Sequence, residues 1–187
     1  KATHWLVDQF LPEGDSILAG ASFVGKTFVL TNLVNVMLGL ITQENLVASR
    51  RRDIVWITED VDQILQALSV LDYNEGCSSE DFFKHCLLVP AQRVQAELLG
   101  PVVENLIKAR GWDSSHNPPL IIVDTMAASL ECEDINQAAK ASKLLASLRQ
   151  CWRAYSILIT MHTAKAGDNK EAMGSVAFKA DMQNAFY

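Results

Sequence analysis

Residues 16–40, SILAGASFVGKTFVLTNLVNVMLGL, join a short apolar run to a longer apolar run through a loop that begins at Gly20 and contains Gly25. Gly20 to Thr27 fit the pattern G-x-x-x-x-G-K-[ST] in full. The spacing predicts a strand over residues 16–19 and a helix over residues 27–40. Backbone N–H groups of such a turn point inward and attract an anion, which the positive end of the helix also favours. This stretch therefore predicts a phosphate-binding turn inside an α/β unit.

The turn has the residue types that a nucleoside triphosphate and Mg²⁺ require. Glycines at both ends allow backbone angles and a close approach that a side chain would block. Lys26 would place a cation on the β- and γ-phosphates, and the Thr27 hydroxyl would face Mg²⁺. The alternative is a glycine-containing turn with a chance Lys-Thr pair, and the flanking strand and helix argue against it. The residues expected to bind the nucleotide are Gly20, Ala21, Ser22, Phe23, Val24, Gly25, Lys26 and Thr27.

The rest of the chain alternates short apolar runs with longer amphipathic stretches, a pattern typical of a parallel sheet with helical crossovers. About five strands are expected, and we expect residues 1–187 to form one α/β domain whose mostly parallel sheet has helices on both faces. Besides residues 16–19, strands are predicted over residues 53–58, 87–89, 120–123 and 155–160. Further helices are predicted over residues 61–71, 95–110 and 134–152, and Gly111 would stop the second of these.

Composition excludes several protein classes. Apolar residues make up 49% of the 187 residues and charged residues 20%, which excludes a disordered or collagenous chain. The net charge of −6 argues against a broadly basic surface that binds nucleic acid, although a local basic loop is compatible with this charge.

The sequence also bears on where the protein is found. No apolar run is long enough to cross a bilayer, and four scattered cysteines suit reduced thiols, so a cytoplasmic protein is expected. The first residue is not Met and the last lies in an apolar-aromatic segment, so we expect a piece of a longer protein, truncated at its C-terminus.

Polar residues follow three of the predicted strands, at the sheet edge where ligands of parallel sheets bind. Asp124 comes after LIIV and would hold the Mg²⁺ shell, with a turn or capping role as its alternative. Glu59 comes after DIVWIT and would deprotonate the attacking water. Its neighbour Asp60 competes for that role, but is more easily read as the cap of the following helix. His162 comes after ILIT-Met and would sense the γ-phosphate. Its position supports this role and that of an ordinary residue at the edge of the sheet equally well.

Two further segments carry clusters of charge. Residues 164–180 form a long polar stretch with Lys165, Lys170 and Lys179, which is either a functional loop or a disordered connection with solvated lysines. The cluster at residues 50–52, three consecutive arginines, reads as a solvated turn at the amino end of the sheet, far from the phosphates.

Taken in order, these motifs resemble the RecA-like P-loop ATPases and, within them, the RepA-like hexameric replicative helicases and their AAA-type relatives. The likeness covers nearly the whole chain: WLVDQFLPEGDSILAG, GASFVGKT, VWITED, LIIVDTMAASL, ILITMHTAKAG and GSVAFKADMQNAFY. It implies that Lys26 and Thr27 contact phosphate and magnesium, and that Glu59 is the catalytic carboxylate. It also implies Asp124 as the metal-side carboxylate, His162 as the γ-phosphate sensor, and a hexameric ring with ATP at its subunit junctions.

The chain departs from this pattern in one respect and leaves three function classes open. Ring helicases carry an arginine within about ten residues of the Gly174-Ser175 position, whereas this chain offers Lys179 and Gln183. Either a lysine substitutes, or the arginine lies beyond the C-terminus, or activation by a neighbour is absent.

The resemblance predicts an ATPase that is a DNA helicase of the replicative type, moving on single-stranded DNA. The alternatives are a regulatory or recombination-type ATPase and, with less support, a phosphotransferase.

Overall fold

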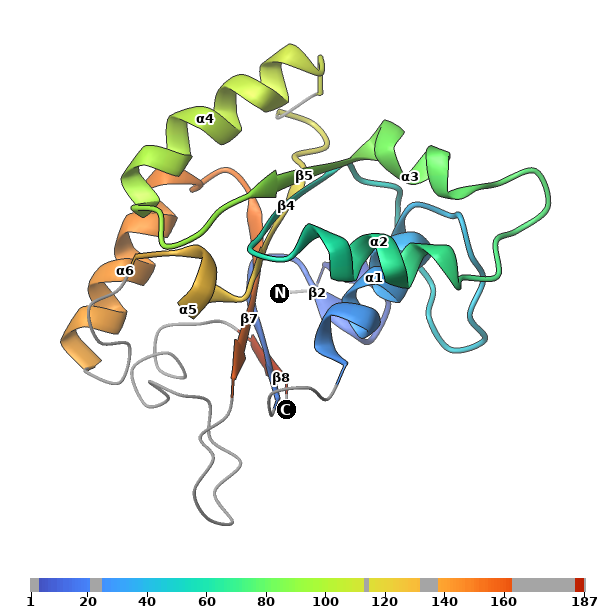
Figure 1. The fold of residues 1–187 in the computed structure, drawn as a ribbon, viewed down its shortest axis with the longest axis horizontal. Coiled ribbons are helices and arrows are strands. Elements are labelled where there is room, and N and C mark those ends of the chain that lie inside the picture. Colours follow the sequence, from blue (N-terminus) through green and yellow to red (C-terminus); the bar gives the residue numbers. More distant parts are fainter. Residues whose placement is uncertain (1–3, 21–24, 113–114, 132–137, 163–183, 187) are drawn as a thin grey trace, which may run out of the picture.

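The computed structural model describes residues 4–20, 25–112, 115–131, 138–162 and 184–186. In this part of the chain, six strands form one sheet in which every neighbouring pair is parallel (Figure 1). The strands, in spatial order, are β5 (Cys86–Pro90), β4 (Ile54–Thr58), β6 (Leu120–Asp124), β7 (Ser156–His162), β3 (Asp15–Gly20) and β8 (Asn184–Phe186). β7 lies between β3 and β6, so the strand that ends in His162 separates the strand before the glycine loop from the strand that ends in Asp124.

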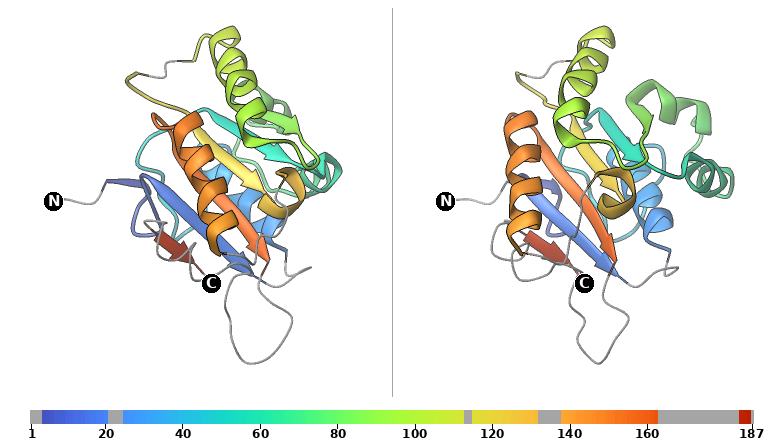
Figure 2. Two further views of the ribbon diagram at one scale, coloured as in Figure 1. Left: turned by 90° about the vertical axis from the view of Figure 1, so that its left-hand side faces the viewer. Right: turned by 60° about the vertical axis from the view of Figure 1, so that its left-hand side comes forward.

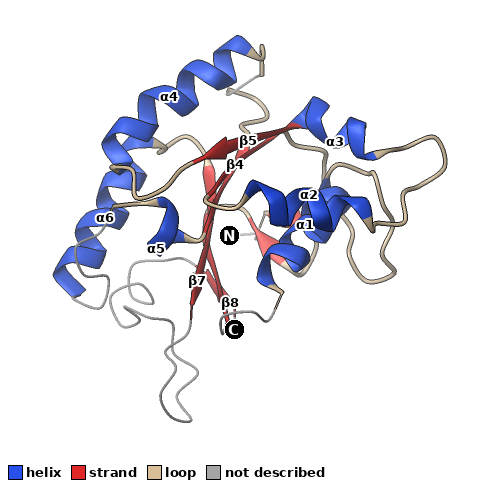
Figure 3. Cartoon of the chain, in the orientation of Figure 1, coloured by secondary structure: helices blue, strands red, loops and turns tan. Residues whose placement is uncertain are grey.

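Helices cover both faces of this sheet, which confirms the predicted α/β architecture (Figures 1 and 3). The face on one side is covered by α1 (Lys26–Met37), α2 (Val61–Ser69) and α3 (Ser79–His85). The other face is covered by α4 (Ala96–Ala109), α5 (Met126–Ser129) and α6 (Ala138–Cys151), and Figure 2 shows α6 lying along the strands. Helix α4 ends at the residue before Arg110, and Gly111 follows with a φ of 67°, as the sequence predicts.

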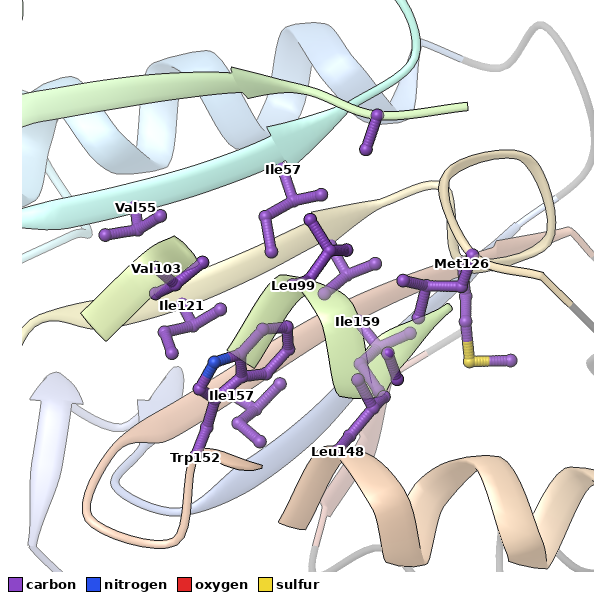
Figure 4. Packing of buried hydrophobic residues seen from close by; sticks show 14 of the residues in the cluster. Val55, Ile57, Leu99, Val103, Ile121, Met126, Leu148, Trp152, Ile157 and Ile159 are labelled. Carbon is purple, nitrogen blue, oxygen red and sulfur yellow. The ribbon is translucent and has the colours of Figure 1, made fainter. Parts of the chain in front are cut away.

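The two faces of the sheet have separate apolar cores, because strand side chains alternate between faces. On the α4–α6 side, Val55, Ile121 and Ile157 pack against Val103 and Trp152 (Figure 4). The opposite core is built around alternate residues of the same strands and the inner side of α1. That core contains Ile54, Trp56, Leu120, Ile122, Leu158, Leu30 and Val34. Both cores are needed to hold the central strands in register, since β4, β6 and β7 are buried from both sides.

One row of side chains changes from apolar to polar at the carboxyl end of the sheet, on the α1 side. Trp56 and Ile122 are apolar, but the next residues on the same face are Thr58 and Asp124, which are paired in register. Val123 pairs with Ile159, so Thr160 lies beside Asp124. We call Thr58, Asp124 and Thr160 the polar row. Because the row continues a buried face, all three side chains are at most 3% exposed.

Several elements differ from the prediction. The five expected strands are present, but β6 includes Asp124 and β7 extends to His162, because Gly20 pairs with His162 and continues the ladder. Helices α1 and α2 end earlier than expected. The prediction missed the short strands β1 (Trp5–Val7), β2 (Leu11–Pro12) and β8, and also the helix α3, although Ser78 and Asp81 form a capping box at its start.

The arginine cluster is not the solvated turn that the sequence suggests. Arg50 is exposed, but the Arg52 side chain is buried and donates to Glu13 Oε1 and to the Pro118 carbonyl, the latter at 3.2 Å. Its position before β4 explains the burial, because the guanidinium fills space under the amino end of the sheet and finds acceptors there. Among the residues described, no helix combines the length and apolar character needed to cross a bilayer.

Candidate functional site

A cavity of about 550 Å³ opens at the carboxyl ends of the strands, where α1, α2 and the polar row meet. Its walls include Glu59, Asp124 and His162, the polar residues that follow three of the predicted strands, together with the residues at the start of α1. The side chains and backbone that line it are those of Gly25, Lys26, Thr27, Phe28, Thr58, Glu59, Asp60, Gln63, Gln66, Ala67, Asp124, Thr125 and His162. Five residues to which the sequence assigns a role at a phosphate site, namely Lys26, Thr27, Glu59, Asp124 and His162, therefore border a single cavity.

The end of the glycine loop has the geometry that an anion-binding helix start requires. Gly25 has a φ of 82°, a left-handed conformation that favours glycine, and α1 begins at the next residue. The first intrahelical bond runs from the Val29 N–H to the Gly25 carbonyl at 3.0 Å, so the N–H groups just before it have no partner within the helix. The positive end of α1 therefore faces the cavity. The predicted contacts at Ala21, Ser22, Phe23 and Val24 lie outside the described residues.

Lys26 holds its ammonium group at the base of the cavity. The Nζ atom donates to the Gly20 carbonyl at 3.0 Å and lies 3.2 Å from Nδ1 of His162, so the two strand ends β3 and β7 both contact it. Burial lowers the pKa of Lys26, and the charge of Asp124 partly offsets this effect. A cation held in place before any ligand arrives loses little freedom on binding a phosphate.

Asp124 lies beneath the cavity with both carboxylate oxygens engaged. Oδ2 accepts the Thr27 hydroxyl at 3.0 Å, and Oδ1 accepts the Thr160 hydroxyl at 2.5 Å. The side chain is almost fully buried, and this burial raises the pKa of Asp124 against the opposing effects of the two hydroxyls and of Lys26. A carboxylate and a hydroxyl 3.0 Å apart fit Mg²⁺, which takes oxygen ligands, keeps several waters and uses phosphate oxygens for the rest.

Glu59 and Asp60 follow β4 and have different surroundings. Asp60 is the N-cap of α2, and its Oδ1 accepts the Gln63 N–H at 3.0 Å, which confirms the predicted capping role. Glu59 stays at the rim of the cavity. Partial removal from water raises the pKa of Glu59, and the charges of Asp124 and Asp60 raise it further. A carboxylate with a raised pKa in a cavity is better suited to accept a proton than an ordinary surface glutamate.

The structure adds cavity residues that the sequence reasoning missed. Gln63, Gln66 and Ala67 extend α2 along one wall, and Phe28 lines the wall of α1. Gln63 is three residues after Asp60, and Gln66 and Ala67 are three and four residues after Gln63, a spacing that places them on one side of the helix. The basic stretch at residues 164–180 lies outside the described residues, and so do the expected contacts of Lys165, Lys170 and Lys179.

Comparison with known proteins agrees with this geometry. The model of a family described as AAA domain matches residues 1–168, which is most of the chain. A search of curated proteins gives no significant match. The match spans the glycine loop, the strand ends at Glu59 and Asp124, and β7 up to His162. The chain therefore belongs to the AAA domain family, whose members are nucleotide-binding ATPases of the P-loop, RecA-like superfamily.

Proposed function

We propose that this chain hydrolyses ATP in an Mg²⁺-dependent reaction and acts as one subunit of a ring-shaped motor on single-stranded DNA. The observation that carries the hydrolytic part is the convergence of Lys26, Thr27, Glu59, Asp124 and His162 on one cavity. Positioning and charge stabilisation account for most of the catalysis of phosphoryl transfer, and these side chains supply both.

The residues at the start of α1 would hold the phosphates. The N–H groups of the first turn, which have no acceptor within the helix, and the Lys26 ammonium would bind the β- and γ-phosphate oxygens. Thr27 and Asp124 would hold the metal ion, which when bound neutralises charge that develops on the phosphates. Lys26 Nζ lies 3.2 Å from His162 Nδ1, so a γ-phosphate that draws Lys26 toward itself would change the environment of His162.

Glu59 would act as the general base. It would accept a proton from a water that attacks the γ-phosphorus, and the bond to the oxygen bridging the β- and γ-phosphates would break to leave ADP and inorganic phosphate. Gln63 and Gln66 lie on the neighbouring wall, where their amide groups can hydrogen-bond a water or a phosphate oxygen.

The ring is supported by the charge of the cavity in the described part of the chain. Among the described residues that line it, Lys26 is the lysine and none is an arginine. In a ring, a basic residue of the neighbouring subunit would supply further transition-state charge, and Lys179 is the candidate at the position where ring helicases carry their arginine. The proposal of single-stranded DNA as the track rests on the resemblance to replicative helicases and on the lysines of residues 164–180.

Two measurements test this proposal. ATP hydrolysis is measured with and without single-stranded DNA, using Lys26→Ala as the inactive reference, and we expect DNA to stimulate hydrolysis. Basal hydrolysis that DNA leaves unchanged would favour a regulatory or recombination-type ATPase, and turnover only with a small acceptor would favour a phosphotransferase. The mass of the particle with Mg²⁺ and a nonhydrolysable ATP analogue tests the ring directly, since a monomer under these conditions would refute it.

A further inference from the structure

Thr160 is fully buried in the central strand β7, and the chemistry proposed above does not use it. Its hydroxyl donates to Asp124 Oδ1 at 2.5 Å, one of the shortest hydrogen bonds among those described. The residues on either side, Ile159 and Met161, pack in the apolar core of the opposite face. Thr160 is therefore the polar residue that follows Leu158 on the α1 side of β7, directly beside the carboxylate.

The contact fixes one oxygen of Asp124 and so decides what the other oxygen can do. A carboxylate is planar, so an oxygen held by Thr160 leaves Oδ2 directed at the Thr27 hydroxyl, 3.0 Å away. Thr160 is itself rigid, because threonine is branched at Cβ and because β7 is paired on both sides, with β6 and β3. The chain of contacts runs from a rigid strand to the carboxylate and from the carboxylate to the first turn of α1.

We infer that Thr160 is a positioning residue, whose hydroxyl orients the Asp124 carboxylate and through it the Thr27 hydroxyl, and so sets the affinity of the site for Mg²⁺-bound ATP. This inference rests on the proposed function. Without the hydroxyl, the buried carboxylate has one partner fewer and can turn about its last side-chain bond, which separates Oδ2 from Thr27. Partners that orient metal-binding groups in this way commonly change metal affinity by about 10- to 100-fold when they are removed.

The test compares Thr160→Val, which has nearly the same shape but no hydroxyl, with Thr160→Ser, which keeps the hydroxyl. ATP binding is measured by calorimetry over a range of Mg²⁺ concentrations, in a Glu59→Gln background so that hydrolysis does not interfere. For Thr160→Val we expect the Mg²⁺ concentration at half-saturation to rise at least about tenfold. ATP affinity in the presence of a chelator should change by less than about twofold, since Lys26 and the helix start are intact. Thr160→Ser should restore the Mg²⁺ response to within about threefold of the parent.

Thr31→Val is the matched control, because Thr31 is also fully buried but its hydroxyl donates to the backbone carbonyl of Thr27 at 2.8 Å, within α1. It should leave the Mg²⁺ response within about twofold of the parent. The inference is overturned if Thr160→Val responds to Mg²⁺ like the parent, or if Thr160→Ser fails to restore the response. The inference is also overturned if Thr160→Val lowers the affinity for ATP in the presence of the chelator as much as it lowers the affinity for ATP in the presence of Mg²⁺. If ATP binding by the parent is itself indifferent to Mg²⁺, the proposed function fails at that first comparison and the inference fails with it.

Discussion

The two ends of the sheet both carry charged side chains, but they arrange them in opposite ways. At the amino end, charges of opposite sign pair with one another: Arg52 with Glu13, and Arg149 with Asp15 at 2.8 Å. At the carboxyl end, three carboxylates gather beside a cavity, and their mutual repulsion contributes to the raised pKa of Glu59.

This difference separates a structural arrangement from a functional one. Paired charges need nothing from outside, since each group has a partner, and removing one partner leaves the other charge uncompensated. Like charges around a cavity repel one another and so cost stability, but such carboxylates can bind a cation or accept a proton during a reaction. Substitutions at the carboxyl end should therefore affect activity more than folding, and substitutions at the amino end should do the reverse.

The largest effect is expected for Lys26→Ala, which removes the cation from the carboxyl end. Hydrolysis should fall by about a thousandfold, because a preorganised charge at the transferring phosphate is lost. The midpoint of thermal unfolding should change little, and Lys84→Ala, at an exposed lysine that pairs with Asp81, is the control. If the Lys26→Ala protein hydrolysed ATP at nearly the wild-type rate, the assignment of the carboxyl end of the sheet as the site of hydrolysis would be wrong.

Glu59→Gln comes next and tests the assignment of the base. We expect ATP binding to be kept and the rate of hydrolysis to fall by about a hundredfold, as for loss of a general base. Single-turnover hydrolysis and equilibrium binding are measured on the same protein. Asp60→Asn, which keeps an oxygen for the helix cap, is the comparison, and a greater loss in that variant would identify Asp60 as the catalytic carboxylate.

Glu13→Gln tests the amino end. Loss of the carboxylate leaves the buried Arg52 guanidinium without its charged partner, so the free energy of unfolding should fall by about 2 kcal/mol. Urea unfolding measures the change, and ATP hydrolysis per folded molecule should stay within about twofold. Arg50→Gln removes the exposed partner of the same glutamate and should cost about 0.5 kcal/mol or less. Equal losses from both variants would contradict the structural role of the buried pair.

A smaller effect than that of Glu13→Gln is expected for Asp60→Ala, at the carboxyl end, because Asp60 is the N-cap of α2. The free energy of unfolding should fall by about 1 kcal/mol, since the Gln63 N–H loses its acceptor. Hydrolysis should fall less than in Glu59→Gln. If hydrolysis fell without any loss of stability, Asp60 would have a role in the reaction and not in capping the helix.

The main elements of the fold were predictable because they follow local patterns. Apolar runs such as residues 120–123 and amphipathic helices such as α4 identify themselves by spacing and by their flanking glycines and prolines. The short strands β1, β2 and β8 did not, since two or three residues show no period, and β8 pairs with β3, which is far away in the sequence. The burial of Arg52 was equally invisible, because its acceptors come from Glu13 and Pro118, which are remote in sequence.

The candidate site was predictable where it lies at strand ends, because parallel strands bring those residues to one edge whatever the lengths of the connections. Residues on α2 such as Gln66 depend on how the helix is rotated against the sheet, which the sequence does not state. Thr160 was hidden for another reason. A threonine at the end of an apolar run favours a strand by its shape, and its hydroxyl becomes meaningful only beside Asp124.

The polar row also restricts where residues can be inserted or deleted during the evolution of proteins with this sheet. Its three members share a face only while β4, β6 and β7 keep their pairing, and side chains alternate with a period of two. One residue inserted within β6 would turn Asp124 toward α5 and bring an apolar neighbour into the cavity. Insertions and deletions should therefore accumulate in the connections that follow the helices, while the spacing within each strand stays unchanged.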